Sequence, residues 1–578
     1  MSFSQLRTGW LLAIAVLLFS GCADSTESTA AQTSLADLVL KNGNVITLEG
    51  DTPLQALAVR GDTIVGLGSD AEIEAFVGPQ TQVIDLDGRT AIPGFIEGHG
   101  HFLSFGRAQQ ILDLTTANSW DDIVGQVAAA ADAAAPGEWI FGRGWHQEKW
   151  QQLPAELVDG VPVNDALNRV APEHPVVLGH ASGHAAMVNA AALRAAGIDN
   201  DTADPPGGTI VRKTDGTPTG LLRENAEDPV NQAAAAYQAS FSAAERERVA
   251  REQVTLAGRA VLRHGITSFH DAGTSFTDID FLHQVANEDG LPVRLYVMIG
   301  GESLAAMQAR VASPGPLVDH PFLTVRSIKQ QIDGALGSHG AWLLAPYSDL
   351  PTTEGLVLQD IDTLTAIAEF ARDFDLQLNV HAIGTRANRE TLNLYERVWQ
   401  AAEVVGADLR WRIEHAQHVH PLDVPRFAEL GVFAAVQGVH CTSDGPWIPT
   451  RLGAPRTQLT SYRWRDLLDT GARVGNGTDA PVEAIDPIAS FHASVVRRLG
   501  TGALFYPQQA MTRMEALRSY TIENAYGAFA EDRVGSLKVG KLADIAVLSQ
   551  DLLTVPDEEI LNTRVEMTIL NGQVVFRI

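Results

Sequence analysis

Apolar runs of an extended type alternate along the chain with segments of helical periodicity. The apolar runs number eight: AIPGFIEGHGH, GITSFHDAG, PVRLYVMIG, LTVRSIKQQIDG, LQLNVHAIG, RWRIEHAQ, VFAAVQGVH and RVGNGTDAP. Between most of them apolar residues recur every three to four positions, as in TLTAIAEFARDFD, which predicts amphipathic helices. One such helix is expected from Ser242 to about His264, because Ser242 and Glu245 match a capping box and Gly265 follows. Eight parallel strands with helical crossovers predict an α/β fold, a (β/α)8 TIM barrel over residues 91–534.

The two ends of the chain have a different pattern. Residues 35–90 and 535–578 contain short alternating strands, separated by turn pairs such as Asn42-Gly43 and Asn571-Gly572. Neither half has enough strands to cover its own apolar face, so we expect both to form one small β-sandwich. Residues 102–241 interrupt the barrel pattern with two helical segments and a stretch rich in Gly and Pro. They predict an inserted subdomain over the C-terminal end of the first strand.

The first 21 residues are typical of an export signal. Arg7 precedes an apolar run at residues 11–19, which is shorter than the roughly 20 residues that a membrane helix needs. Small residues then precede Cys22, which resembles a bacterial lipoprotein signal; an ordinary secretory signal is the alternative. Residues 1–21 are thus predicted to be a lipoprotein signal peptide, Cys22 the lipidated residue, and residues 22–34 a flexible tether. We expect an exported, lipid-anchored protein of the cell envelope.

Composition narrows the classes of partner. The chain carries 42 Lys and Arg against 70 Asp and Glu, a formal net charge of −28, whereas nucleic acid selects a basic face. We therefore expect no nucleic-acid partner and interpret the acidity as a solubility feature. The cysteines are Cys22 and Cys441, so acylation of Cys22 leaves no intramolecular disulfide. The sequence leaves the oligomeric state open, with a homodimer as one expectation.

Metal-binding residue types gather where the predicted strands end. They are His99 and His101 in the first run, Lys329 in the fourth, His381 in the fifth, His415 in the sixth and Asp479 in the eighth. In a barrel these ends converge on one mouth. Imidazoles with a carboxylate form a ligand set suited to Zn²⁺ and similar divalent ions. A lone histidine is more often packed or on the surface; the ordered series predicts a metal site.

This ordered series resembles the amidohydrolase superfamily, and more narrowly the branch that includes the N-substituted formamide deformylases. The matching stretches include IPGFIEGHGH, KQQIDGALGSHGAWL, NVHAIGTRAN, RIEHAQHV and GNGTDAPV, and the resemblance extends from Leu35 onward. It implies one or two divalent ions, with Zn²⁺ as the expected metal. The residues it implies as ligands are His99 and His101 at the more buried ion, His381 and His415 at the more exposed one, Lys329 as a carboxylated bridge between two metals, and Asp479 as the acid/base beside them.

The resemblance also implies the chemistry, which is hydrolysis of a non-peptide carbon–nitrogen bond in a small amide-like substrate. Asp479 is expected to take a proton from the attacking water and to return one to the leaving nitrogen. His440, which ends the seventh run, is a second catalytic candidate that would hydrogen-bond the substrate carbonyl. Substrate-binding candidates are His184, Trp145 and Asp333, although core packing is the alternative for Trp145 and a turn for Asp333.

Three rival interpretations accompany this one. The same centre also suits cyclic imide, carbamate or N-acyl amino acid bonds, because function depends on loops that vary within a fold. A catalytically silent, lipid-anchored binding protein would lack metal ligands, and this sequence retains the series. A structural zinc site is usually closed by four ligands, whereas more candidates converge here.

Glu414 and Arg386 lie next to ligand candidates in the sequence, and we expect them to orient these ligands.

Overall fold

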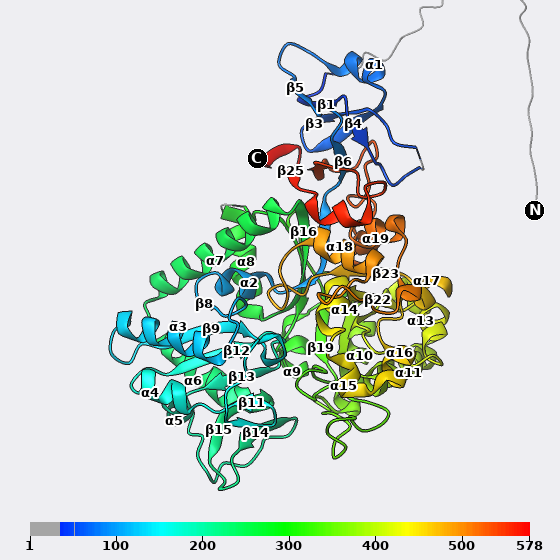
Figure 1. Cartoon of the computed structure of the whole chain (residues 1–578). Coiled ribbons are helices and arrows are strands. Elements are labelled where there is room, and N and C mark those ends of the chain that lie inside the picture. Colours follow the sequence, from blue (N-terminus) through cyan, green and yellow to red (C-terminus); the bar gives the residue numbers. More distant parts are fainter. Residues whose placement is uncertain (1–34, 51, 289) are drawn as a thin grey trace, which may run out of the picture.

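A barrel of eight parallel strands forms the centre of the structure, with a small two-sheet domain at one end and a subdomain inserted beside it (Figure 1). The computed structural model describes residues 35–50, 52–288 and 290–578. The predicted signal peptide, Cys22 and the tether lie outside these described residues. Among the helices of the described part, none is long and apolar enough to cross a membrane.

The eight predicted runs all become barrel strands, which confirms the fold class. In barrel order they are β7 (Phe95–Gly100), β16 (Ile266–Thr274), β17 (Arg294–Ile299), β19 (Leu323–Gln331), β20 (Gln377–Ala382), β21 (Arg412–His415), β22 (Phe433–Gln437) and β23 (Val474–Gly477). Neighbouring strands pair in parallel from β7 to β23. The circle closes where the Asp479 N–H donates to the His99 carbonyl at 2.8 Å and the Thr478 N–H to the Glu97 carboxylate at 2.5 Å. This closure brings the ends of the first and last strands together.

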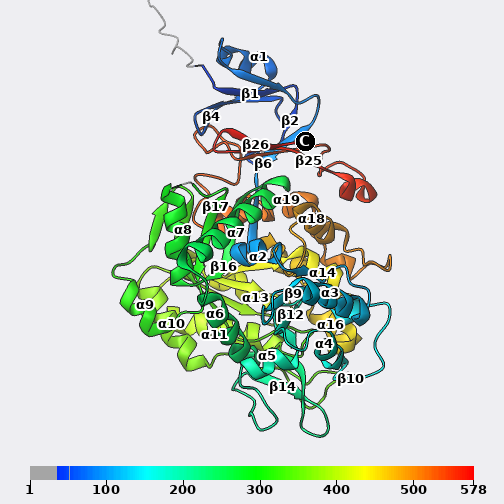
Figure 2. The same cartoon turned by 90° about the vertical axis from the view of Figure 1, so that its left-hand side faces the viewer.

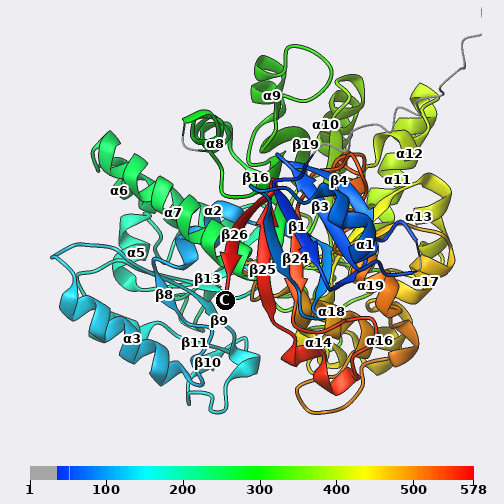
Figure 3. The ribbon, with the colours of Figure 1, turned by 90° about the horizontal axis from the view of Figure 1, so that it is seen from above.

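Helices between the strands surround the barrel (Figure 3). They include α8 (Phe276–Glu288), α9 (Leu304–Arg310), α10 (Ile361–Asp373), α11 (Thr385–Ala402), α13 (Val424–Leu430), α17 (Trp464–Asp469) and α18 (Pro487–Val496). The helix expected after Ser242 is α7 (Ala243–Arg263). Ser242 accepts from the Glu245 N–H, and Gly265 follows with φ +73°, a conformation that glycine adopts without strain. The Glu245 carboxylate pairs with Arg248 at 2.8 Å.

The two chain ends meet in one sandwich, which lies above the barrel in Figure 2. One sheet holds β1 (Leu38–Lys41), β3 (Ala56–Arg60), β4 (Thr63–Gly68) and β5 (Gln82–Asp85); the other holds β2 (Asn44–Val45), β6 (Thr90–Pro93), β24 (Ile545–Leu548), β25 (Val565–Leu570) and β26 (Gln573–Arg577). β6 pairs directly with β24 from the other end of the chain. The run AIPGFIEGHGH is therefore two strands, and the chain enters the barrel at Gly94. A Cβ there would lie 2.3 Å from Thr267 Oγ1, so glycine lets the chain pass closely.

The insertion is a subdomain with its own sheet. The sheet order is β14 (Gly208–Arg212), β15 (Pro218–Glu224), β13 (Ala185–Val188), β12 (Val176–His180), β9 (Ile140–Trp145) and β8 (Leu112–Asp113). The helices with it are α3 (Trp120–Ala133), α4 (Asp165–Val170), α5 (Ala190–Ala195) and α6 (Asp228–Ala239). The sequence predicts two helices in this segment, whereas the structure has this sheet and four helices. Its strands are short and its apolar residues form a separate core with Trp120, Trp145 and Met187.

Candidate metal centre and its pocket

The metal-ligand candidates converge at the C-terminal mouth of the barrel. His99, His381 and His415 lie at the ends of β7, β20 and β21, whereas His101 directly follows β7 and Asp479 comes two residues after β23. The His99 and His415 rings are 4.7 Å apart between centroids, and the His381 and His415 rings 4.5 Å. Ligand atoms of His99, His101 and Asp479 all lie within 4.8 Å of one another. The structure thus brings together residues that are far apart in the sequence.

Unpartnered buried atoms indicate what this cluster binds. His99 Nε2, His381 Nε2 and Asp479 Oδ1 are buried and have no hydrogen-bond partner among the described residues. His101 Nε2 approaches Asp479 Oδ1 to 3.2 Å without hydrogen-bond geometry, as two ligands of one ion do. A buried polar atom without a partner costs about 1–3 kcal/mol. One or two divalent cations would satisfy these atoms, so the residues fit a metal centre.

The ionisation of the cluster suits the same role. Burial lowers the pKa of His99 to about 4 and holds the pKa values of His381 and His415 well below the ordinary value. These imidazoles are therefore neutral at neutral pH, the form that binds a metal. Burial alone would raise the pKa of Asp479, but its contacts with His99, His101 and His440 hold that pKa well below its usual range. The cluster offers neutral nitrogens and an ionised oxygen.

Two ligand candidates are oriented by groups behind them. His99 Nδ1 contacts the Glu414 carboxylate, which in turn pairs with Arg412, Nε to Oε1 at 2.6 Å. His415 Nδ1 hydrogen-bonds Gln437 Oε1 at 2.7 Å. These contacts turn the Nε2 atoms toward the centre, as outer groups of metal sites do. Glu414 thus has the expected orienting contact, whereas Arg386 does not, because it starts α11 and faces Glu390 at 3.5 Å.

Lys329 is buried in β19 and lines the polar cavity that also contains His101, His381, His415 and Asp479. Burial lowers the pKa of its amine, and the charges of Glu414 and Asp479 oppose this only in part. A buried lysine beside metal ligands would be repelled by a cation unless its charge is removed. The position and the lowered pKa of Lys329 are consistent with the bridging role that the family resemblance implies.

His440 occupies a different element from the predicted one. β22 ends at Gln437, and His440 lies in the short helix α14 (Gly438–Asp444), since the apolar run continues into the start of the helix. Its Nε2 is 3.6 Å from Asp479 Oδ2, and its Nδ1 is 3.8 Å from Glu483 Oε1. Burial alone would lower its pKa, but the carboxylates of Asp479 and Glu483 raise it to about 10. His440 is thus a cation held between two carboxylates.

The three substrate-binding candidates have different environments. His184 lines both cavities at the mouth and hydrogen-bonds Glu224 through Nδ1 at 2.8 Å. Asp333 is fully buried and accepts the N–H groups of Ile383 and Gly384 at 3.0 and 2.8 Å. Its carboxylate thus joins the loop after β19 to the segment between β20 and α11, which is neither a local turn nor a free group for substrate contact. Trp145 packs in the core of the insertion and donates from Nε1 to a backbone carbonyl at 2.8 Å, behind the pocket wall.

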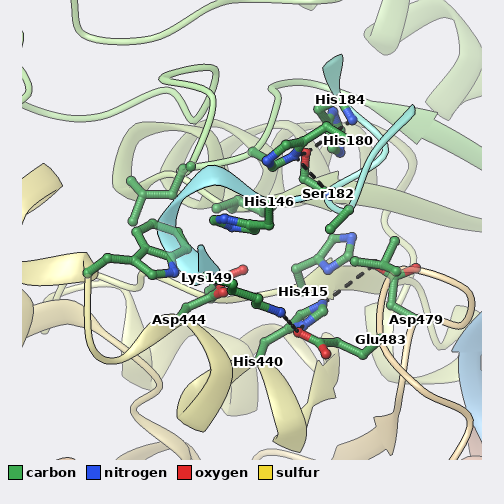
Figure 4. A pocket seen from close by; sticks show the side chains of 18 residues that line it. His146, Lys149, His180, Ser182, His184, His415, His440, Asp444, Asp479 and Glu483 are labelled. Carbon is green, nitrogen blue, oxygen red and sulfur yellow. Dashed lines mark hydrogen bonds and ion pairs between the residues drawn. The ribbon is translucent and has the colours of Figure 1, made fainter. Parts of the chain in front are cut away.

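Side chains of the insertion and the barrel together form the pocket (Figure 4). Sequence reasoning missed a group of polar lining residues: His146, Lys149, His180, Ser182, Asp444 and Glu483. Glu483 follows Asp479 by four residues in the same loop, and this spacing could have identified it. The insertion residues carry no such signal, because their position depends on how the subdomain packs over the barrel mouth.

The fold and site define a class of metal-dependent hydrolases in which the ligands come from the ends of barrel strands. The sequence profile of the amidohydrolase family matches residues 82–576. The chain therefore belongs to the amidohydrolase family, as the sequence motifs predict.

Comparison with individual proteins supports the same family. The chain is 32% identical to Protein LONG AFTER FAR-RED 3 of Arabidopsis thaliana, covering 89% of this chain and 87% of that protein. It is 30% identical to the putative amidohydrolase YtcJ of Bacillus subtilis (91% and 97% covered) and 27% identical to the N-substituted formamide deformylase of Arthrobacter pascens (93% and 98% covered). Among solved structures it is similar to an uncharacterized metal-dependent hydrolase from Pyrococcus horikoshii, with a TM-score of 0.71, 25% identity and 90% and 99% of the two chains covered.

Proposed function

We propose that this member of the amidohydrolase family hydrolyses a non-peptide carbon–nitrogen bond in a small amide or formamide. The observation that carries the proposal is the convergence of three unpartnered buried atoms, His99 Nε2, His381 Nε2 and Asp479 Oδ1, at the barrel mouth. The name of one relative, N-substituted formamide deformylase, supports a formamide or a similar amide as substrate. The pocket lies beneath the insertion, which favours a small molecule over a polypeptide.

In this proposal His99, His101, His381, His415 and Lys329 hold one or two divalent ions, and the nitrogen-rich ligand set favours Zn²⁺. A bound ion of this kind lowers the pKa of water and polarises the scissile carbonyl. Glu414 and Gln437 keep the ligand rings in position.

Asp479 performs the proton transfer. Its carboxylate is ionised and points into the pocket, so it orients the attacking water, accepts a proton and later delivers one to the leaving nitrogen. His440 lies on the other carboxylate oxygen, 3.6 Å away, and holds the aspartate in place. It is therefore a positioning residue for Asp479 in this proposal, in addition to the carbonyl contact that the sequence suggested.

The test combines metal analysis with a substrate panel. Purified protein is analysed for bound metal and assayed on N-substituted formamides, N-acyl amino acids, cyclic imides and carbamates. We expect turnover of a formamide or simple amide that chelation abolishes and Zn²⁺ restores. Turnover confined to cyclic imides, carbamates or N-acyl amino acids would contradict the formamide or amide substrate and assign that other class instead. Bound metal without turnover of any compound would contradict the enzymatic proposal and favour a binding protein.

We also propose that Cys22 carries the lipid that anchors the exported protein to a membrane, a proposal that rests on the sequence pattern around this cysteine. Full-length protein expressed in a bacterium should sediment with membranes, and Cys22→Ser should release it or leave it unprocessed. A wild-type protein without lipid on Cys22 by mass spectrometry, or a Cys22→Ser protein that is processed like wild type and still sediments with membranes, would contradict the anchor.

A further inference from the structure

We propose that His184 and Glu224, both from the insertion, form a dyad in which Glu224 orients the His184 ring and His184 hydrogen-bonds the scissile group of the substrate. This inference rests on the proposed function, because it assigns the insertion a part in the same reaction. It makes His184 a substrate-contacting residue and Glu224 its positioning residue.

The geometry of His184 differs from that of His180, its neighbour in the roof, and a carboxylate holds its Nδ1, whereas the Nδ1 of His146 accepts a backbone N–H. The Nδ1 of His184 bonds Glu224 Oε2 at 2.8 Å, and among the described residues no group hydrogen-bonds its Nε2. The ring lies 5.1 Å from that of His381, centroid to centroid, and lines both cavities that meet over the metal-ligand candidates. By contrast, His180 uses both ring nitrogens, with Ser182 at 2.8 Å and Gln147 at 3.2 Å. His184, which lies near His180 and Ser182 in Figure 4, therefore keeps one nitrogen for a substrate.

Glu224 is fixed from two sides. It ends β15 with φ +53° and ψ −130°, a region in which a side chain is strained and which persists only where the surroundings determine it. Its side chain is 3% exposed. A Cβ on Gly334 or Gly340 would lie 2.0 or 2.4 Å from Glu224 Oε1, so these two glycines of the loop after β19 leave space for the carboxylate.

A purely structural pair would have no need of this arrangement. An ion pair that only stabilises the insertion would satisfy both partners, yet Glu224 Oε1 has no hydrogen-bond partner among the described residues. The single strong bond of Glu224 goes to the one ring atom that sets the direction of the free Nε2. A carboxylate that fixes a histidine in this way is the usual support for an imidazole that acts on a substrate.

The experiment compares five zinc-loaded proteins: wild type, His184→Ala, His184→Gln, Glu224→Gln and the double variant Glu224→Gln/His184→Ala. The rate is measured on the panel amide that wild type turns over fastest. We expect kcat/KM to fall roughly 10- to 100-fold in His184→Ala and in Glu224→Gln. The double variant should be no slower than His184→Ala, because Glu224 acts through His184. His184→Gln, which keeps a polar group near the Nε2 position, should recover part of the rate.

A second readout does not need turnover. Acetohydroxamate mimics the scissile amide, and we expect its Kd for the zinc-loaded enzyme to rise at least tenfold in His184→Ala, while metal content and thermal midpoint stay near those of wild type. The matched control is Glu173→Gln, an exposed glutamate of the insertion, which should change neither value.

The outcomes separate the dyad from the proposed function. Turnover by wild type with unchanged rates in His184→Ala would overturn the dyad and leave the hydrolase proposal intact. Strictly multiplicative losses in the double variant, or no recovery with His184→Gln, would also overturn it. The wild type could also bind acetohydroxamate and hydrolyse no amide. In that case weaker binding of acetohydroxamate by His184→Ala would support the dyad and refute the hydrolase proposal.

Discussion

Glu414→Gln tests whether the buried carboxylate behind His99 sets up the metal centre. Glu414 and Arg412 both have 0% side-chain exposure, and removing one partner of a buried ion pair costs about 3–5 kcal/mol. Arg412 keeps the Gly98 carbonyl at 2.7 Å and His270 Nδ1 at 3.1 Å, so we expect the lower end, about 3 kcal/mol. Loss of the carboxylate on His99 Nδ1 should also weaken metal binding about 10- to 100-fold, or about 1.4 to 2.8 kcal/mol.

Two assays separate these effects. Unfolding of the metal-free proteins isolates the ion pair, and chelator competition isolates metal affinity. The matched control is Glu531→Gln, which breaks the ion pair of Arg410 and Glu531 at 2.7 Å, whose side chains are 19% and 29% exposed. It should cost at most about 1 kcal/mol and leave metal affinity unchanged. If Glu414→Gln binds metal as tightly as wild type, Glu414 does not orient a ligand and the reasoning fails.

Three further predictions follow from other parts of the structure. Asp479→Asn should retain metal, measured by elemental analysis, and lose about 10²- to 10⁴-fold in kcat; near wild-type turnover would refute its acid/base role. Gly98→Ala places a Cβ 2.4 Å from the Asn476 carbonyl and should destabilise by about 1–3 kcal/mol in thermal unfolding, whereas Gly125→Ala, in α3 with open space, should stabilise by up to about 1 kcal/mol. A hydrogen bond from Ser536, opposed by burial and helped by nearby lysines, lowers the pKa of Glu49 from its ordinary 4.5. The contribution of Glu49 to stability is therefore present above pH 4.5 and is lost as the pH falls below that value. The unfolding midpoints of wild type and Glu49→Gln should thus differ at neutral pH and coincide in acid. A difference that persists in acid would refute this prediction.

The barrel could be predicted because parallel strands are buried on both faces and therefore form continuous apolar runs. Because such runs are apolar throughout, the sequence does not show where a run passes from one sheet to another. AIPGFIEGHGH leaves the sandwich at Pro93 and enters the barrel at Phe95 without a change in hydrophobicity. Likewise VFAAVQGVH stays apolar as β22 ends and α14 begins, so His440 is assigned to a strand from the sequence although it lies in a helix.

The candidate site likewise contains residues that the sequence could predict and residues that it could not. Ligand candidates such as His99, His381 and His415 could be predicted to converge, because barrel topology brings every strand end to one mouth. The His184–Glu224 contact could not, since it joins β15 to the turn before β13 across 40 residues of an irregular subdomain. The strands of this subdomain are short, and their pairing depends on tertiary packing, which the periodicity of the sequence does not show.

This division suggests how the enzyme separates chemistry from selection. In the proposed function, the ligand candidates and Asp479 of the barrel act on the reacting bond, whereas His146, Lys149 and Ser182 of the insertion line the part of the pocket beyond it. Substitutions at barrel positions should change metal affinity and kcat, and substitutions at these roof positions should change KM and the choice among amides. His184 is the exception, because it comes from the insertion and yet lies beside His381. If His184 contacts the reacting group as we propose, turnover depends on correct docking of the insertion, and disturbing that docking should lower kcat even where every metal ligand remains in place.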